Sequence, residues 1–146
     1  MRRLLVPAAL ALLLLPSAAS AGTKNPCLLI TSDDINTAFS YMLGGKVGAG
    51  KAGAYGGYKS CAYSFKKKSV VVYTRQVSKT VFVKDAMKNP PPVVPVVGVG
   101  EAAFSAGAGV ALLVWQKGTE ITVGFNGISP AVESQRAIVR IGFKRT

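Results

Sequence analysis

Few residues in this chain are able to do chemistry. Its 146 residues include six acids and two cysteines but no histidine. Without histidine, no Ser-His-Asp or Cys-His arrangement can form, and metal sites with imidazole ligands are excluded. Glu101 is the one acid flanked by glycine and alanine in a stretch that reads as buried, and an acid in apolar surroundings is a candidate general acid. One hypothesis is therefore a cryptic carboxylate-based hydrolase centred on Glu101.

The other five acids read as structural. Asp33 and Asp34 follow Thr31, where they would occupy the first turn of a helix and meet the positive end of its dipole. The remaining acids are expected at the surface: Asp85, Glu120 and Glu133. Because no paired carboxylates are evident, and a lone carboxylate is usually structural, the sequence favours a non-enzymatic binding or sensing module. No cofactor and no metal is expected.

A glycine-rich stretch covers residues 44–60, with seven glycines, three lysines and no acid. Within it, Gly45-x-x-x-x-Gly50-Lys51 matches the start of a phosphate-binding P-loop. That motif requires a preceding strand and a Ser or Thr after the lysine, whereas here a helix precedes and Ala52 follows. We therefore expect a flexible surface loop, in which Tyr55 and Tyr58 are candidate contact residues.

The first 21 residues have the pattern of a secretory signal peptide. Arg2 and Arg3 precede an apolar run that ends near Leu15, and small residues lead to a cleavage site after Ala21. The run is shorter than the roughly 20 residues that span a bilayer, and no cysteine follows the site for lipid attachment. We expect a secreted or periplasmic protein that is soluble after cleavage, and a single domain over residues 22–146.

Two cysteines remain in the exported chain, Cys27 and Cys61. Because extracytoplasmic compartments are oxidising, a disulfide between them is the default expectation. It would close a loop of about 35 residues and contribute about 3–4 kcal/mol in the chain-entropy model. The alternatives are a reactive thiol or a metal pair, but the chain has no further cysteine and no histidine to complete a metal site.

Period-2 and helical patterns predict an α+β domain, with an antiparallel sheet of about five strands packed by about three helices. The central prediction is a hairpin around Lys117-Gly118 that sets Trp115 opposite Glu120 and Leu112 opposite Val123. The order α-β-β-α-β-β-β-α comes from a helix opened by Thr31, strands 61–65 and 70–74, a helix over 79–88, strands 101–105, 110–115 and 120–125, and a last helix opened by Ser129-Pro130.

Lysines dominate the charge of the exported chain. Without Arg2 and Arg3, sixteen basic residues stand against six acids, a net charge of +10. Such a charge suits an anionic envelope polymer, a lipid headgroup or an envelope protein, although excess lysine can also serve solubility alone. If the two hairpins share one sheet, their tips are expected to meet at an edge that carries Lys46, Lys51, Lys59, Lys66, Lys67, Lys68 and Lys117. Nucleic acid is disfavoured because the lysine-rich tip lacks interleaved aromatic residues.

Several short motifs resemble a widespread bacterial envelope family of small secreted proteins and lipoproteins with a domain of unknown function. The motifs are Pro26-Cys27-Leu28-Leu29 before a Thr-capped helix, Cys61-x-Tyr63, Gly98-x-Gly100-Glu101-Ala102-Ala103-Phe104 and the Lys117-Gly118 turn. The resemblance implies an α+β fold with a helix-packed antiparallel sheet and a Cys27–Cys61 bridge. It supplies no activity and no site. This chain differs in lacking a lipid-anchor cysteine and in its long glycine-rich stretch.

Overall fold

The structure is a computed structural model that describes residues 23–146. The predicted signal peptide and its cleavage site lie outside the described residues. The strands are β1 (Lys51–Tyr55), β2 (Tyr58–Phe65), β3 (Lys68–Gln76), β4 (Val94–Pro95), β5 (Ala102–Ala106), β6 (Ala111–Gln116) and β7 (Thr119–Asn126), and the helices are α1 (Pro26–Leu29), α2 (Ser32–Leu43), α3 (Lys79–Ala86) and α4 (Val132–Lys144).

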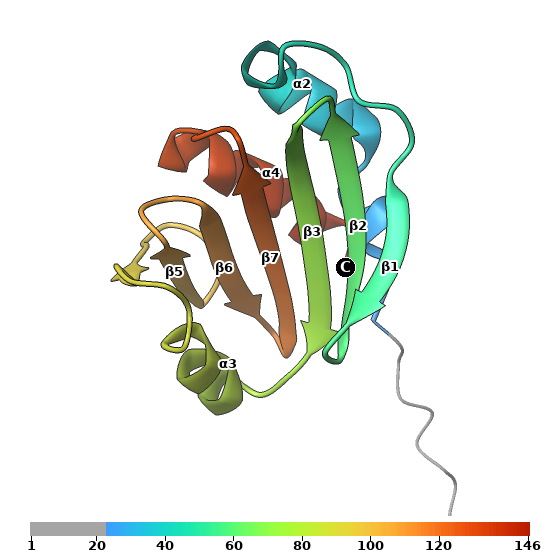
Figure 1. The fold of residues 1–146 in the computed structure, drawn as a ribbon. Helices are drawn as coiled ribbons and strands as arrows, with labels where there is room; N and C mark the ends of the chain where they lie inside the picture. Colours follow the sequence, from blue (N-terminus) through green and yellow to red (C-terminus); the bar gives the residue numbers. More distant parts are fainter. Residues whose placement is uncertain (1–22) are drawn as a thin grey trace, which may run out of the picture.

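All seven strands form one antiparallel sheet in the order β1-β2-β3-β7-β6-β5-β4 (Figure 1). The predicted α+β class and antiparallel sheet are confirmed, but the expected counts of about five strands and three helices are too low. The additional elements are α1, β1 and β4. None of the helices in residues 23–146 is long and apolar enough to cross a membrane.

Strand β1 lies where a flexible loop was expected, so that part of the prediction is wrong. Tyr55 and Tyr58 are partners across Gly56-Gly57, whose φ angles of 54° and 83° are the left-handed values of a two-residue hairpin turn. Glycine and alanine have low strand propensity. Here the pairing of β1 with β2 overrides that preference, because the glycines at the turn set the register.

The predicted central hairpin is confirmed as β6 and β7. Lys117 and Gly118 have φ angles of 46° and 84°, and the register sets Trp115 opposite Glu120 and Leu112 opposite Val123. One detail is wrong: the strand was expected to begin at Val110, but Val110 precedes β6 and its exposed fraction is 46%.

The two faces of the sheet are covered differently. On one face, helices α1, α2 and α4 enclose the main core, whose strand residues include Cys61, Tyr63, Val70, Val72, Leu112, Val114, Ile121 and Val123. Thr31 caps α2, as the sequence predicts, and it forms a reciprocal capping box with Asp34. Gly44 ends the helix in the left-handed conformation.

On the opposite face, only α3 of the described helices packs against the sheet, over β5 and β6. Ser78 caps α3, and Phe82 and Ala86 provide its buried side. Figure 1 shows β1, β2 and β3 with no helix in front of them on this face. The face therefore has a covered half and an open half.

Helix α4 differs from the sequence prediction at its start. It begins at Val132, and its cap residue Ala131 makes no side-chain hydrogen bond, so the predicted Ser129-Pro130 cap is wrong. The Nε2 of Gln135 donates instead to the carbonyl oxygens of Gly109 and Pro130, at 3.1 and 2.8 Å. These bonds place Gln135 in the buried stripe, and Val132 is left exposed.

The predicted disulfide between Cys27 and Cys61 is confirmed, and it ties α1 to β2 across 34 positions. Replacing both cysteines with alanine is expected to lower the free energy of unfolding by about 3 kcal/mol, because the unfolded chain gains loop entropy. Thermal unfolding with and without reductant is the measurement. Reductant should lower the midpoint of the wild-type protein and leave that of the double variant unchanged; an unchanged wild-type midpoint would contradict a structural role.

An ion pair links the end of the chain to its first long helix. Arg145 Nη1 and Nη2 bind the two carboxylate oxygens of Asp34, the latter at 3.1 Å, and Nη1 also donates to the carbonyl oxygen of Leu29. The Arg145 hydrogen bond is the main reason that the pKa of Asp34 falls from 3.8 to about 2, with further lowering by Thr31.

This lowered pKa has a pH signature. A carboxylate whose folded-state pKa is lowered stabilises the fold above its unfolded value, and that contribution is lost as the pH falls from about 4 to about 2. In the variant Arg145→Met, the pKa of Asp34 should rise toward 3.8, and less stability should be lost within this window. A carboxyl-carbon NMR titration of Asp34 in both proteins tests it, and an unshifted pKa would refute the pairing.

Candidate functional site

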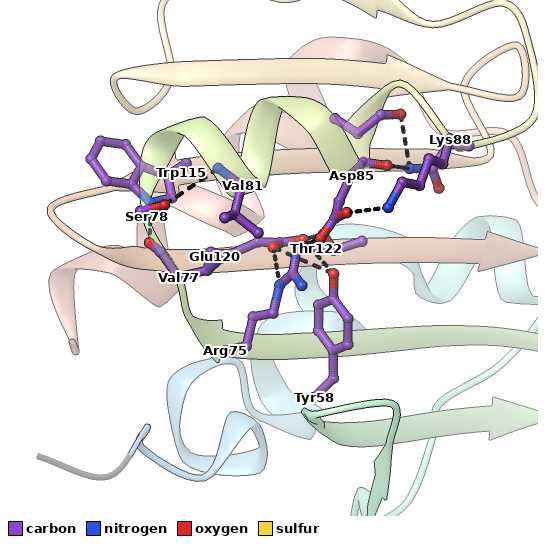
Figure 2. Close-up of polar contacts among 12 residues, drawn as sticks. Tyr58, Arg75, Val77, Ser78, Val81, Asp85, Lys88, Trp115, Glu120 and Thr122 are labelled. Atoms are coloured by element: carbon purple, nitrogen blue, oxygen red, sulfur yellow. Dashed lines mark hydrogen bonds and ion pairs between the residues drawn. The ribbon is translucent and has the colours of Figure 1, made fainter. Parts of the chain in front are cut away.

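A buried glutamate lies at the border between the covered and open halves of the α3 face. Glu120, on β7, is 1% exposed. Its carboxylate accepts hydrogen bonds from Arg75 Nε at 2.6 Å, from the Thr122 hydroxyl at 3.0 Å and from the Tyr58 hydroxyl at 3.2 Å (Figure 2). The sequence prediction of a surface position for Glu120 is wrong, because β3 brings an arginine beside it and compensates the buried charge.

The same arginine joins the sheet to α3. Arg75 Nη2 lies 2.9 Å from Asp85 Oδ2, and Asp85 pairs with Lys88 at 2.7 Å. Figure 2 shows the chain of alternating charges from β7 through β3 to the end of α3. Hydrogen bonds from Lys88 and Arg75, in that order, lower the pKa of Asp85, and those to Glu120 and Asp85 raise the pKa of Arg75 despite its burial.

Tyr58 is the member of this network that lies nearest the open half of the sheet. The guanidinium of Arg75 lies over the Tyr58 ring at 4.4 Å, and the ring of Tyr73 meets that of Tyr58 edge-on at 6.1 Å. Burial, followed by the nearby charge of Glu120, raises the pKa of Tyr58 to about 12. Tyr58 is therefore a neutral hydrogen-bond donor at any physiological pH, with its hydroxyl already committed to Glu120.

Beside the network, the open half is hollowed. A hollow of about 230 Å³ is lined by Tyr55, Tyr58, Tyr73, Asn89, Leu113, Glu120 and Thr122, and we call it the tyrosine hollow. Tyr55, at its outer rim on β1, is 80% exposed. Aromatic rings of this kind offer an apolar contact surface with a polar tip, which is typical of recognition sites.

The two acids singled out by sequence and structure are both held by contacts within the fold. The carboxylate of Glu120 pairs with Arg75 and accepts hydrogen bonds from the hydroxyls of Tyr58 and Thr122. Glu101 was expected to be buried, but it is exposed, and its Oε1 accepts the backbone N–H of Lys117 at 2.9 Å. That bond holds the β6–β7 turn, which is a structural role.

The lysines that were expected to meet at one edge of the sheet lie at different places in the structure. In the β3–β7 register, Ser69 pairs with Asn126 and Gln76 pairs with Thr119. The tip with Lys66, Lys67 and Lys68 and the tip with Lys117 are therefore at opposite ends of the sheet, roughly 20 Å apart at strand rise. The expectation of a shared edge is wrong, because the hairpins run antiparallel with their turns pointing in opposite directions.

A different feature is the uneven distribution of acids along the chain. Residues 35–84, which form most of α2, all of β1, β2 and β3, and the start of α3, contain nine basic residues and no acid. Lys51 lies on β1, and Lys59 lies on β2 opposite Ala54. None of Lys46, Lys51 and Lys59 forms an ion pair with a described residue, so their charge is not neutralised locally.

Within residues 23–146, no group of three or more acidic or cysteine side chains is placed to hold a metal ion. Comparisons with family models, with curated proteins and with solved structures return no match.

Tyr55 and Tyr58, two of the contact residues named from the sequence, line the tyrosine hollow, whereas Lys51 is not among its lining residues. The roles of Arg75 and Tyr73 and the burial of Glu120 were not expected from the sequence. The register of β6 and β7 already placed Glu120 on the mixed face beside Trp115. The sequence does not reveal which strand pairs with β7. In the structure that strand is β3, and the pairing sets Arg75 opposite Glu120. The one signal in the sequence for a buried acid partner was Arg75, a single arginine at the end of a predicted strand in a stretch without acids.

Proposed function

We propose that this protein is an exported, non-catalytic binding module that holds an anionic component of the cell envelope against the β1–β3 half of its sheet. The observation that carries the proposal is the lack of acids in β1, β2 and β3. Lys51 and Lys59 of these strands are exposed and form no ion pair with a described residue, and Lys51 projects on the side of the tyrosine hollow. Export follows from the predicted signal peptide, and the disulfide is compatible with an oxidising compartment. The resemblance to envelope proteins points in the same direction.

Charge and shape support the same surface. Exposed lysines attract anions at long range, with a strength that falls as salt screens them. The tyrosine hollow adds apolar contact at short range. The Glu120–Arg75 network fixes Tyr58 and Tyr73 in place, so the surface needs little ordering when a ligand arrives, which favours affinity.

Two triple variants with equal net charge test the location of the surface. The first changes Lys46, Lys51 and Lys59 to glutamine, and the matched control changes Lys84, Lys117 and Lys144, which are exposed on other parts of the molecule. The measurement is the salt concentration that elutes each protein from a sulfonated matrix, and binding to vesicles that contain anionic phospholipid.

The first triple variant should elute at clearly lower salt than its control, because a local surface loses charge where the matrix contacts it. Equal shifts for the two variants would show that net charge alone is responsible, and the binding module proposal would then lose its support. A greater loss from the control variant would place the surface near the β6–β7 turn and α4.

A further inference from the structure

Strand β1 is an open edge of the sheet. All five of its residues are exposed, and they carry small side chains except at Lys51 and Tyr55. Edge strands present unpaired backbone groups that other chains can pair with, and proteins commonly block them with proline, charge or a covering element. The opposite edge is blocked in this way, because β4 is two residues long and one of them is Pro95.

The backbone of β1 shows which groups are free. In a two-residue hairpin the pair that flanks the turn is hydrogen-bonded, and such pairs alternate along the ladder. Tyr55, Gly53 and Lys51 therefore bond inward to β2, and the N–H and C=O groups of Ala52 and Ala54 point outward. Neither alanine makes a further hydrogen bond with residues 23–146.

The side chains leave room for another strand along this edge. Lys51 and Tyr55 project on the side of the tyrosine hollow, with only Gly53 between them. Ala52 and Ala54 project on the helix-packed side, where Ala52 is opposite the buried Cys61. From β1 itself, a strand that pairs with this edge would meet one lysine and one tyrosine on the first side and two methyl groups on the other, where Lys59 of β2 lies opposite Ala54.

Net charge favours an acidic segment over a second copy of this chain as the strand that pairs with β1. A second copy of the chain would bring its own net positive charge and its own Lys51 to the interface, and like charges oppose such pairing. An acidic segment would instead meet Lys51 on the side of the tyrosine hollow and Lys59 on the helix-packed side, neither of which forms an ion pair with a described residue. Addition of an extended peptide to a sheet edge is an established recognition mode in which main-chain bonds give affinity and side chains give specificity.

We propose that β1 docks an extended acidic segment of a partner polypeptide, which adds an eighth strand to the sheet. Its backbone exchanges hydrogen bonds with Ala52 and Ala54, and its carboxylates lie beside Lys51 on the side of the tyrosine hollow. The inference rests on the proposed function and makes it specific, since it identifies the anionic component as a polypeptide that needs a strand edge.

The probe is a short fluorescent peptide in which glutamate alternates with valine, titrated into the full exported chain by fluorescence anisotropy. A second peptide has the same sequence with its central peptide nitrogens methylated, which keeps the charge and removes the N–H donors. We expect methylation to weaken binding by roughly tenfold or more, because lost hydrogen bonds and a steric clash with β1 act together. Replacing glutamate with lysine in the peptide should abolish binding.

The matched protein variants are Ala54→Pro and Ala54→Val. Proline removes an N–H that points away from β2, so the hairpin keeps its own bonds, and valine retains the donor in a good strand former. Proline should weaken peptide binding by roughly tenfold or more, and valine by less than about twofold. If the proline variant does not fold, the methylated peptide on the wild-type protein decides.

Equal binding of the methylated and unmethylated peptides would overturn the strand-edge proposal, even if the lysine triple variant still supports an anion-binding surface. Loss of a wild-type dimer in Ala54→Pro, measured by sedimentation, would also overturn it and assign β1 to self-association. Binding of anionic vesicles but not of the acidic peptide would identify lipid as the ligand and reject the polypeptide.

Discussion

Replacing Arg75 with leucine is expected to lower the free energy of unfolding by about 3–5 kcal/mol, a large part of the stability of a domain of this size. The change leaves the carboxylate of Glu120 buried, with only the hydroxyls of Tyr58 and Thr122 as donors. It also removes the link between β3 and Asp85 on α3. Chemical denaturation followed by fluorescence or circular dichroism is the measurement.

A double variant distinguishes the free-energy cost of leaving one buried charge unpaired from the net stability that the Arg75–Glu120 ion pair contributes. Changing Arg75 and Glu120 together to leucine should restore much of the lost stability, because no charge then remains unpaired in the interior. Lys88→Gln is the control, since its exposed pair with Asp85 is screened by solvent and should contribute little to stability. A double variant as unstable as Arg75→Leu would show that side-chain packing, rather than charge, explains the loss.

Aspartate should destabilise the protein far more at Val72 than at Val71, its neighbour on β3. Val72 is fully buried against the main core, whereas Val71 lies on the open half of the opposite face and is partly exposed. Val72→Asp places an uncompensated carboxylate in apolar surroundings and is expected to cost several kcal/mol, enough to unfold much of the protein.

Val71→Asp should lower stability by about 1 kcal/mol or less, from the loss of strand propensity and partial packing. Thermal midpoints of the two variants test which face of β3 is covered. Similar losses would mean that an additional element covers the β1–β3 half, and the proposed binding surface would then be buried.

Much of the fold follows from local patterns in the sequence. The Thr31 cap and the Gly44 stop define α2, and the alternation around Lys117-Gly118 gives the β6–β7 register. These features depend on residues close together in the chain, where propensity and turn chemistry act directly.

The site is less predictable because its parts come from distant segments. Arg75 and Glu120 meet only through the non-local pairing of β3 with β7, and Tyr58 joins them from β2. For the same reason, a buried glutamate looks like a surface residue until its partner is placed. Strand β1 was missed because its glycines and alanines indicate a loop, although they are also the residues that leave the edge of the sheet accessible.

The most direct test of the binding surface is amide hydrogen exchange at β1, measured by NMR with and without the glutamate–valine peptide. In the free protein, the amides of Ala52 and Ala54 should exchange much faster than that of Gly53, which bonds to β2. Saturating peptide should slow exchange at both alanines by roughly tenfold or more, as expected when the outward groups pair. Slow exchange at Ala52 and Ala54 in the free protein, or peptide protection centred on Lys117 and α4, would contradict the account.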